Sequence, residues 1–134
     1  MADYFFDSSA LVKAYIAEAG TDWVRTILDD EQHQIYISQL TELEVVAALT
    51  RRFRVGDLTV QECNQAAHDV RQDCETYLIV DLTNEIIEAA IDLALKHNLR
   101  AYDATQLASA LNVKTVLSGN HGHTGLTLVS ADWN

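Results

Sequence analysis

Four acidic residues stand at the edges of short apolar or small-residue segments, too far apart along the chain to meet unless it folds. They are Asp7, Glu44, Asp103 and Asp132. Two of them follow apolar runs typical of buried strands, and parallel strands of an open α/β sheet end at one edge, where ligands bind. Carboxylate oxygens are the ligands that Mg²⁺ and Mn²⁺ prefer, so the pattern predicts a divalent metal site.

Each acid also has an alternative structural interpretation. Asp7 or Ser8 could cap the helix that follows the first strand, and Asp103 lies in the first turn of a helix, where acids are favourable in any case. Ser130 could orient Asp132 by a hydrogen bond. A group of like charges at one edge repels itself, and a cation among the carboxylates would relieve that repulsion.

The second acid, Glu44, has an alternative two positions away on the same predicted helix. Glu42 and Glu44 lie about 200° apart around the helix axis, so only one of them can face a given pocket. Glu44 shares its side with Ala47 and Ala48, small residues that allow close approach of another segment. This helical-face argument, together with the resemblance described below, favours Glu44 over Glu42 as the site residue.

The hydrophobic pattern alternates between strands and pairs of helices. This order predicts an α/β fold, a three-layer sandwich with a central parallel sheet flanked by helices. The expected strands are 3–7, 34–38, 77–82 and 126–130, with 77–82 the clearest buried strand, and the expected helices are 9–18, 21–31, 41–53, 59–76, 83–97 and 102–111.

Composition narrows the class of protein. The 134 residues are 49% hydrophobic and contain no proline, as expected for one compact domain. No signal peptide or membrane-spanning run is evident, so we expect a cytoplasmic protein. Cys63 and Cys74 fall in one predicted helix, too far apart for a disulfide, and are interpreted as reduced packing residues.

The net charge of −11 argues against binding nucleic acid over a broad surface, because that binding depends on phosphate neutralisation by Lys and Arg. It does not exclude a nuclease whose bound cations offset the acidity of its site. Arg51, Arg52 and Arg54 crowd the end of one predicted helix. They could contact RNA or a protein interface, or they could be solvated side chains that complement the helix end.

Four segments together resemble the PIN-domain ribonucleases, and most closely the VapC-type toxins of toxin-antitoxin pairs. These segments are YFFDSSALVK at 4–13, SQLTELEV at 38–45, LRAYDA at 99–104 and LVSAD at 128–132. The resemblance spans nearly the whole chain, 1–134, as one nuclease domain. It implies a Mg²⁺- or Mn²⁺-dependent endoribonuclease, usually a homodimer, that is silenced by an antitoxin whose tail enters the active-site groove.

Carried over to this sequence, the acidic site of the family falls on Asp7, Glu44, Asp103 and Asp132, with its small polar residue on Ser9. Asp7, Asp103 and Asp132 would bind the metal, with Glu44 as a further ligand or as a base. Residues 114–125 form an insertion relative to the family. An alternative alignment would place the fourth strand at 115–118 and Asn120 at the acid position, but we favour Asp132 because 126–129 is the better strand. Family members continue past the final acid, whereas this sequence ends at Asn134, so we expect a truncated C-terminal end.

Two other functions fit parts of the pattern. A PIN fold without catalytic activity would keep the carboxylates and only bind a partner. A receiver-like signalling domain would instead use Asp81, at the end of the strand at 77–82, to accept a phosphoryl group beside Mg²⁺. The absence of an acidic pair directly after the first strand argues against the receiver.

Overall fold

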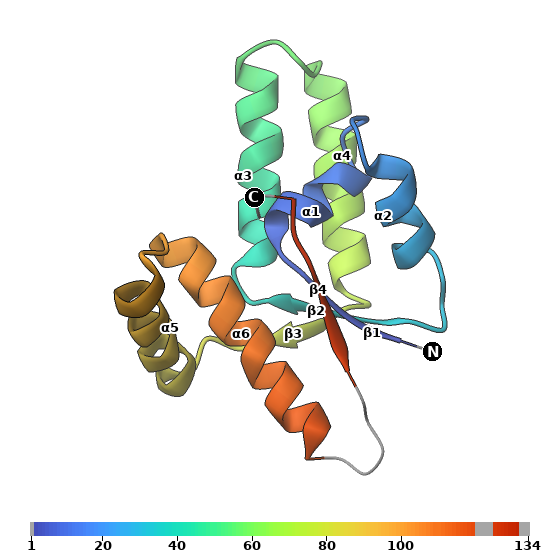
Figure 1. The fold of residues 1–134 in the computed structure, drawn as a ribbon. Coiled ribbons are helices and arrows are strands. Elements are labelled where there is room, and N and C mark those ends of the chain that lie inside the picture. Colours follow the sequence, from blue (N-terminus) through green and yellow to red (C-terminus); the bar gives the residue numbers. More distant parts are fainter. Residues whose placement is uncertain (1, 120–124, 132–134) are drawn as a thin grey trace.

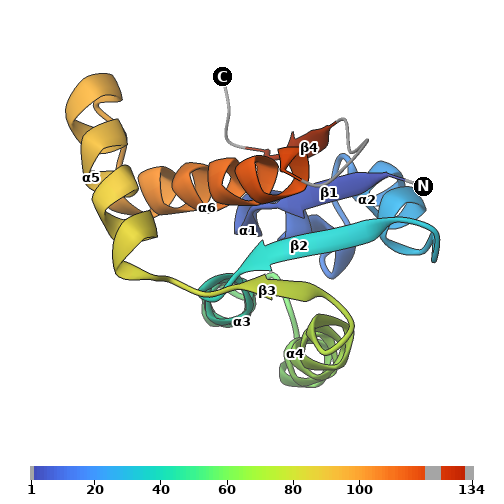
Figure 2. The ribbon, with the colours of Figure 1, turned by 90° about the horizontal axis from the view of Figure 1, so that it is seen from below.

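The computed structural model describes residues 2–119 and 125–131 and contains one parallel sheet. Its four strands follow in the order β3-β2-β1-β4, as Figure 2 shows from bottom to top. The strands are β1 (Asp3–Phe6), β2 (Gln34–Ser38), β3 (Leu78–Val80) and β4 (Leu126–Val129). The first strand is therefore central, with β2 and β4 as its two neighbours.

Helices cover both faces of this sheet. They are α1 (Ser8–Leu11), the 3-10 turn η1 (Val12–Ala14), α2 (Thr21–Leu28), α3 (Thr41–Arg54), α4 (Val60–Cys74), α5 (Asn84–His97) and α6 (Ala101–Ser118). Successive side chains of a strand point to opposite faces. Phe6 of β1 accordingly packs in the core shared with α1 to α4, whereas Phe5 packs against α6. The predicted three-layer α/β sandwich is confirmed, and Figure 1 shows the α3–α4 hairpin apart from the α5–α6 pair.

Strand register brings two predicted site segments to the same edge. Phe6 of β1 is paired with Val129 of β4, and the backbone N–H of Asp7 donates to the carbonyl of Val129 at 3.1 Å. Asp7 and Ser130 are the residues that follow these paired positions. The carboxyl ends of β1 and β4 therefore lie side by side, as the parallel arrangement requires.

The third strand differs from its prediction. The apolar run at 77–82 was expected to be the clearest buried strand, but β3 has three residues and lies at the open edge of the sheet. Leu78 and Ile79 are 44% and 47% exposed. An apolar run reports only that a strand is hydrophobic, and it does not reveal whether a neighbouring strand or another chain covers it.

Two helix predictions are also corrected. The helix expected at 9–18 ends at Leu11 and tightens into η1, after which the chain turns to Gly20, whose φ of 94° suits glycine. The last helix extends to Ser118, so the alternative strand at 115–118 is wrong. Val113 and Leu117, four residues apart, bury one face of this helix against Phe5. Asn120 lies outside the described residues.

Cys63 and Cys74 both point from α4 into the core as free thiols, as predicted. Burial is the main cause that raises the pKa of Cys74 to about 12. Across residues 2–119 and 125–131, no helix has the length and apolar character required to cross a bilayer.

Candidate active site

Asp7 is held rigidly at the junction between β1 and α1. The residue is 3% exposed. Oδ1 accepts the backbone N–H groups of Ser9 at 2.8 Å and Ala10 at 3.3 Å together with the Ser9 hydroxyl, so the helix cap considered as an alternative is present. Oδ2 accepts the Ser130 hydroxyl at 2.8 Å. Because a carboxylate oxygen has two acceptor sites, Oδ2 keeps one for a further partner.

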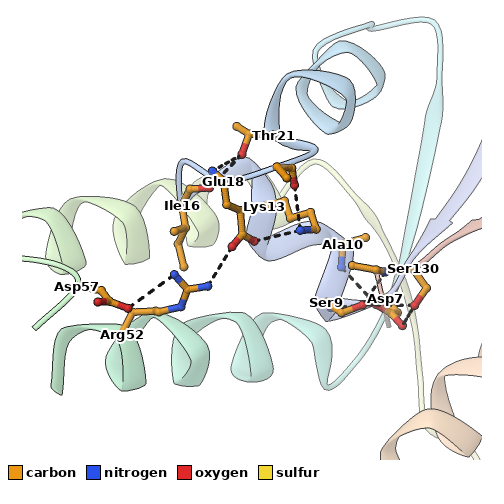
Figure 3. Close-up of polar contacts among 12 residues, drawn as sticks. Asp7, Ser9, Ala10, Lys13, Ile16, Glu18, Thr21, Arg52, Asp57 and Ser130 are labelled. Carbon is orange, nitrogen blue, oxygen red and sulfur yellow. Dashed lines mark hydrogen bonds and ion pairs between the residues drawn. The ribbon is translucent and has the colours of Figure 1, made fainter. Parts of the chain in front are cut away.

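Ser9 and Ser130 join the two strand ends around this carboxylate (Figure 3). The backbone N–H of Ala131 donates to Ser9 Oγ at 3.0 Å, and the two serine hydroxyls are 3.3 Å apart. Ser130 was expected to orient Asp132, which lies outside the described residues. Its hydroxyl donates to Asp7, a contact that the sequence did not predict.

A groove of about 680 Å³ opens beside Ser8 and Ser9, between α1, α3 and α6. Glu44 and Asp103 line it from the first turns of α3 and α6. Its other lining residues are Ser8, Ser9, Val12, Ala48, Arg51, Arg100 and Tyr102. The structure thus brings Glu44 and Asp103 to one groove, next to the serines that follow Asp7.

Glu42 turns away from this groove. Its carboxylate lies 3.7 Å from Arg71 Nε of α4, so it belongs to the contact between α3 and α4. Glu44 and Ala48, one turn apart, both line the groove. This placement agrees with the choice of Glu44 on helical geometry.

Tyr102 is a groove residue to which the sequence assigned no role. Burial is the main cause that raises the pKa of its hydroxyl to about 12, and the negative charges of Asp7 and Glu44 raise it further. Gln106 Nε2 donates to this hydroxyl at 2.6 Å and to Thr41 Oγ1 at 3.3 Å. Gln106 therefore connects the first turn of α6, which carries Asp103, to the start of α3, which carries Glu44. The one feature of the sequence that could have indicated this role is that Tyr102 directly precedes Asp103.

Asp7, Glu44 and Asp103 lie without a basic counterion among the residues that the structure describes. Within the described ranges, no Lys, Arg or His forms an ion pair with Asp7, Glu44 or Asp103. No three His, Cys, Asp or Glu side chains in this part of the chain lie close enough together to hold a metal ion. The described carboxylates supply hard oxygen donors, which suit Mg²⁺ or Mn²⁺, but they do not by themselves form a complete ligand set.

The three clustered arginines point in different directions. Arg51 lines the groove beside Glu44. Arg52 pairs with Glu18 at 3.0 Å and lies 3.9 Å from Asp57, so it braces α3 against the segment after η1 (Figure 3). Arg54 is exposed and does not line the groove.

Comparison with known proteins agrees with this arrangement. The family model "PIN domain" matches residues 4–134. Ribonuclease VapC45 of Mycobacterium tuberculosis (strain CDC 1551 / Oshkosh) is 37% identical over 109 residues, which are 81% of this chain and 75% of that protein.

Two solved structures share the fold. A toxin-antitoxin complex from Klebsiella pneumoniae has a TM-score of 0.62 and 21% identity, covering 83% of this chain and 80% of its own. The Mycobacterium tuberculosis toxin VapC20, described as cleaving the sarcin-ricin loop, has a TM-score of 0.65 and 17% identity, covering 83% of each chain. The match of the family model and the identity to VapC45 show that this chain belongs to the PIN-domain family, among the VapC ribonucleases.

Proposed function

We propose that this chain is a metal-dependent endoribonuclease that hydrolyses RNA phosphodiester bonds and serves as the toxin of a toxin-antitoxin pair. One observation carries the proposal: the buried carboxylate of Asp7 is fixed at the strand edge beside a groove with Glu44 and Asp103, and none of the three has a basic partner among the described residues. Such uncompensated negative charge favours a bound cation. The relative that is 37% identical is named a ribonuclease, which supports the activity.

Mg²⁺ or Mn²⁺ would be bound by Asp7, Asp103 and Asp132, with Glu44 as a further ligand or as a base. When bound, such a cation lowers the pKa of a coordinated water and stabilises negative charge on a phosphate. The chain supplies orientation. The serine hydroxyls and backbone N–H groups fix Asp7, and the Tyr102 hydroxyl stays protonated near neutral pH, so it can donate a hydrogen bond to an oxygen in the groove.

The partners that fit this function are an RNA substrate, an antitoxin and a second copy of the chain, in the cytoplasm. The Klebsiella pneumoniae structure with the same fold is a toxin-antitoxin complex, which supports an antitoxin partner. An exposed apolar face supports a homodimer. It surrounds a cavity between β3 and α6 and includes Leu78, Ile79 and Val116. Leu111 is exposed beside the adjoining cavity between α5 and α6, and α5 exposes Ile87, Ile91 and Leu95, which line neither cavity.

The receiver-like alternative is not favoured. Asp81 follows the edge strand β3 and lines a largely apolar cavity together with Leu78, Ile79 and Val116. Asp7 follows the central strand, and β2 lies between the two. An inactive PIN fold differs from the enzyme only in whether it cleaves RNA, which the following experiment decides.

The test is cleavage of total RNA by the purified chain with Mg²⁺, with Mn²⁺ and with a chelator, beside Asp7→Asn, Asp103→Asn and Asp81→Asn. We expect discrete fragments that require metal, disappear in the first two variants and persist in Asp81→Asn. Absence of cleavage by a folded, antitoxin-free wild type under every condition would favour the inactive fold. Equal loss in all three variants would show that the effect is not specific to the groove.

A further inference from the structure

We propose that Arg51 and Arg100 form the phosphate-binding pair of this groove and hold the RNA backbone on two sides of the carboxylates. The inference deepens the proposed ribonuclease function and rests on it. It assigns a role to Arg100, which no sequence pattern singled out, and it separates Arg51 from its two neighbours Arg52 and Arg54.

The basic side chains of the chain differ in whether they form ion pairs. The chain has nine Lys and Arg residues against twenty Asp and Glu residues. Four of the nine are engaged in ion pairs, namely Lys13, Arg25, Arg52 and Arg71. The other five form no ion pair within the described part of the chain, and two of those five, Arg51 and Arg100, line the carboxylate groove. Cations that remain unpaired in so acidic a protein are available for an external anion.

Arg51 and Arg100 each lie near one of the acids that line the groove. Arg51 lies seven residues after Glu44 on α3, which is about two turns and about 10 Å along the same helical face. Arg100 is the residue before α6 and lies about one turn before Asp103. Both arginines are exposed, and both line the groove without pairing with its acids. They therefore flank the carboxylates from two helices and do not neutralise them.

The charge and the donor groups of the two arginines suit an RNA phosphate. RNA is repelled by a chain of net charge −11 and by the acids of the groove, so binding requires positive charge close to the site. Guanidinium groups present a planar fork of donors that matches phosphate oxygens, and they stay charged at every relevant pH. Two guanidinium groups at the rim of a carboxylate groove would hold the phosphates on either side of the one to be cleaved.

The test measures RNA binding separately from cleavage. In an Asp7→Asn background, fluorescence anisotropy gives the dissociation constant of a short labelled single-stranded RNA of random sequence as salt is varied. Each phosphate contact on a single strand contributes about 0.7 to the slope of log affinity against log salt. We expect Arg51→Ala and Arg100→Ala each to lower the slope by about 0.7 and to weaken binding about fivefold at about 0.1 M salt.

Matched variants make the result specific. Arg54→Ala removes the same charge from the same end of α3, but outside the groove. It should keep the slope of log affinity against log salt that the Asp7→Asn parent shows. Arg51→Lys and Arg100→Lys retain the charge and should also keep the slope, although their affinity falls because the fork of donors is lost. Circular dichroism melts should show that all variants are folded.

Several outcomes would overturn the inference: no salt-dependent RNA binding by the parent, an unchanged slope in both groove variants, or an equal loss in Arg54→Ala. With the slope unchanged, the arginines would serve a protein contact. Cleavage of total RNA by the wild type distinguishes a failure of this inference from a failure of the proposed ribonuclease function. A wild type that cleaves while its arginine variants keep the slope defeats this inference alone, and a wild type that never cleaves while the arginines set the slope defeats the proposed function alone.

Discussion

Ser130 donates its hydroxyl to Asp7 Oδ2 at 2.8 Å and thereby ties the end of β4 to the end of β1. The two oxygens of Asp7 have different surroundings, since Oδ1 caps α1 and Oδ2 accepts the serine from the neighbouring strand. One carboxylate thus contributes both to the local fold and to the proposed site. The two contributions can be separated by the choice of replacement.

Replacing Asp7 by Asn should remove activity but preserve most of the stability. The amide oxygen can still accept the N–H groups of Ser9 and Ala10, whereas Asp7→Ala loses the cap, which costs about 1 kcal/mol. Urea unfolding should therefore rank the wild type and Asp7→Asn above Asp7→Ala, with both variants inactive. If the Asn variant unfolds as readily as the Ala variant, the cap does not account for the role of Asp7 in stability.

Glu44 and Glu42 form a matched pair for testing the groove. Glu44→Gln should lower the cleavage rate by at least about 100-fold, the lower range for the loss of a positioned acid-base group. Glu42→Gln breaks a surface pair with Arg71, worth less than about 1 kcal/mol, and should cleave RNA at nearly the wild-type rate. Single-turnover rates at saturating metal give the comparison. Equal losses in the two variants would contradict the placement of Glu44 as the functional acid of α3.

Tyr102 should make the protein sensitive to alkaline pH. Its pKa is raised from 10.0 to about 12, chiefly by burial, so above pH 10 the unfolded chain releases this proton before the folded chain does. The free energy of unfolding therefore falls as the pH rises from 10 toward 12. Tyr102→Phe should weaken this dependence, although Tyr77, whose pKa is also raised to about 12, keeps part of it.

The same Tyr102→Phe substitution should cost stability at neutral pH. It removes the acceptor of one of the two N–H groups of the buried Gln106 amide, the other of which donates to Thr41, and a buried N–H that loses its acceptor costs about 1–3 kcal/mol. Urea titrations at neutral and alkaline pH measure both effects. An unchanged midpoint at neutral pH would show that Gln106 finds another partner.

The placement of Asp7 at the strand edge and of Glu44 in the groove was predictable because it follows from two regular periods. Parallel strands end at one edge, which places Asp7, and helical spacing separates Glu44 from Glu42 by about half a turn. The helix at 41–53 and the capped helix that follows Thr59 were likewise readable, since Thr59 and Glu62 form a complete capping box. For these elements the local sequence pattern was sufficient.

The features that the sequence did not predict depend on contacts between residues that are far apart in the chain. Arg52 pairs with Glu18 at 3.0 Å, and nothing in the run at 51–54 indicates that partner. The exposure of β3 depends on strand order, which an apolar run does not encode. The bond from Ser130 to Asp7 spans 123 positions and follows from the pairing of β1 with β4.

The uncovered edge of the sheet leads to the last prediction, which concerns assembly. Val116 of α6 is 58% exposed and lines a cavity of about 470 Å³ with Leu78 and Ile79 of β3, on the face proposed to bind a second copy. Val116→Glu would place an unpaired charge in that interface, and burying such a charge is costly. We expect the wild type to sediment as a dimer and this variant as a monomer.

A second glutamate provides the control for that experiment. Val55, in the turn after α3, is 72% exposed and does not belong to the apolar face, so Val55→Glu should remain dimeric. Sedimentation velocity over a range of concentrations distinguishes the species. A wild type that is monomeric throughout, or a Val116→Glu variant that still dimerises, would show that a different surface or partner covers β3. Loss of dimer in both variants would instead point to a general effect of added negative charge on an already acidic chain.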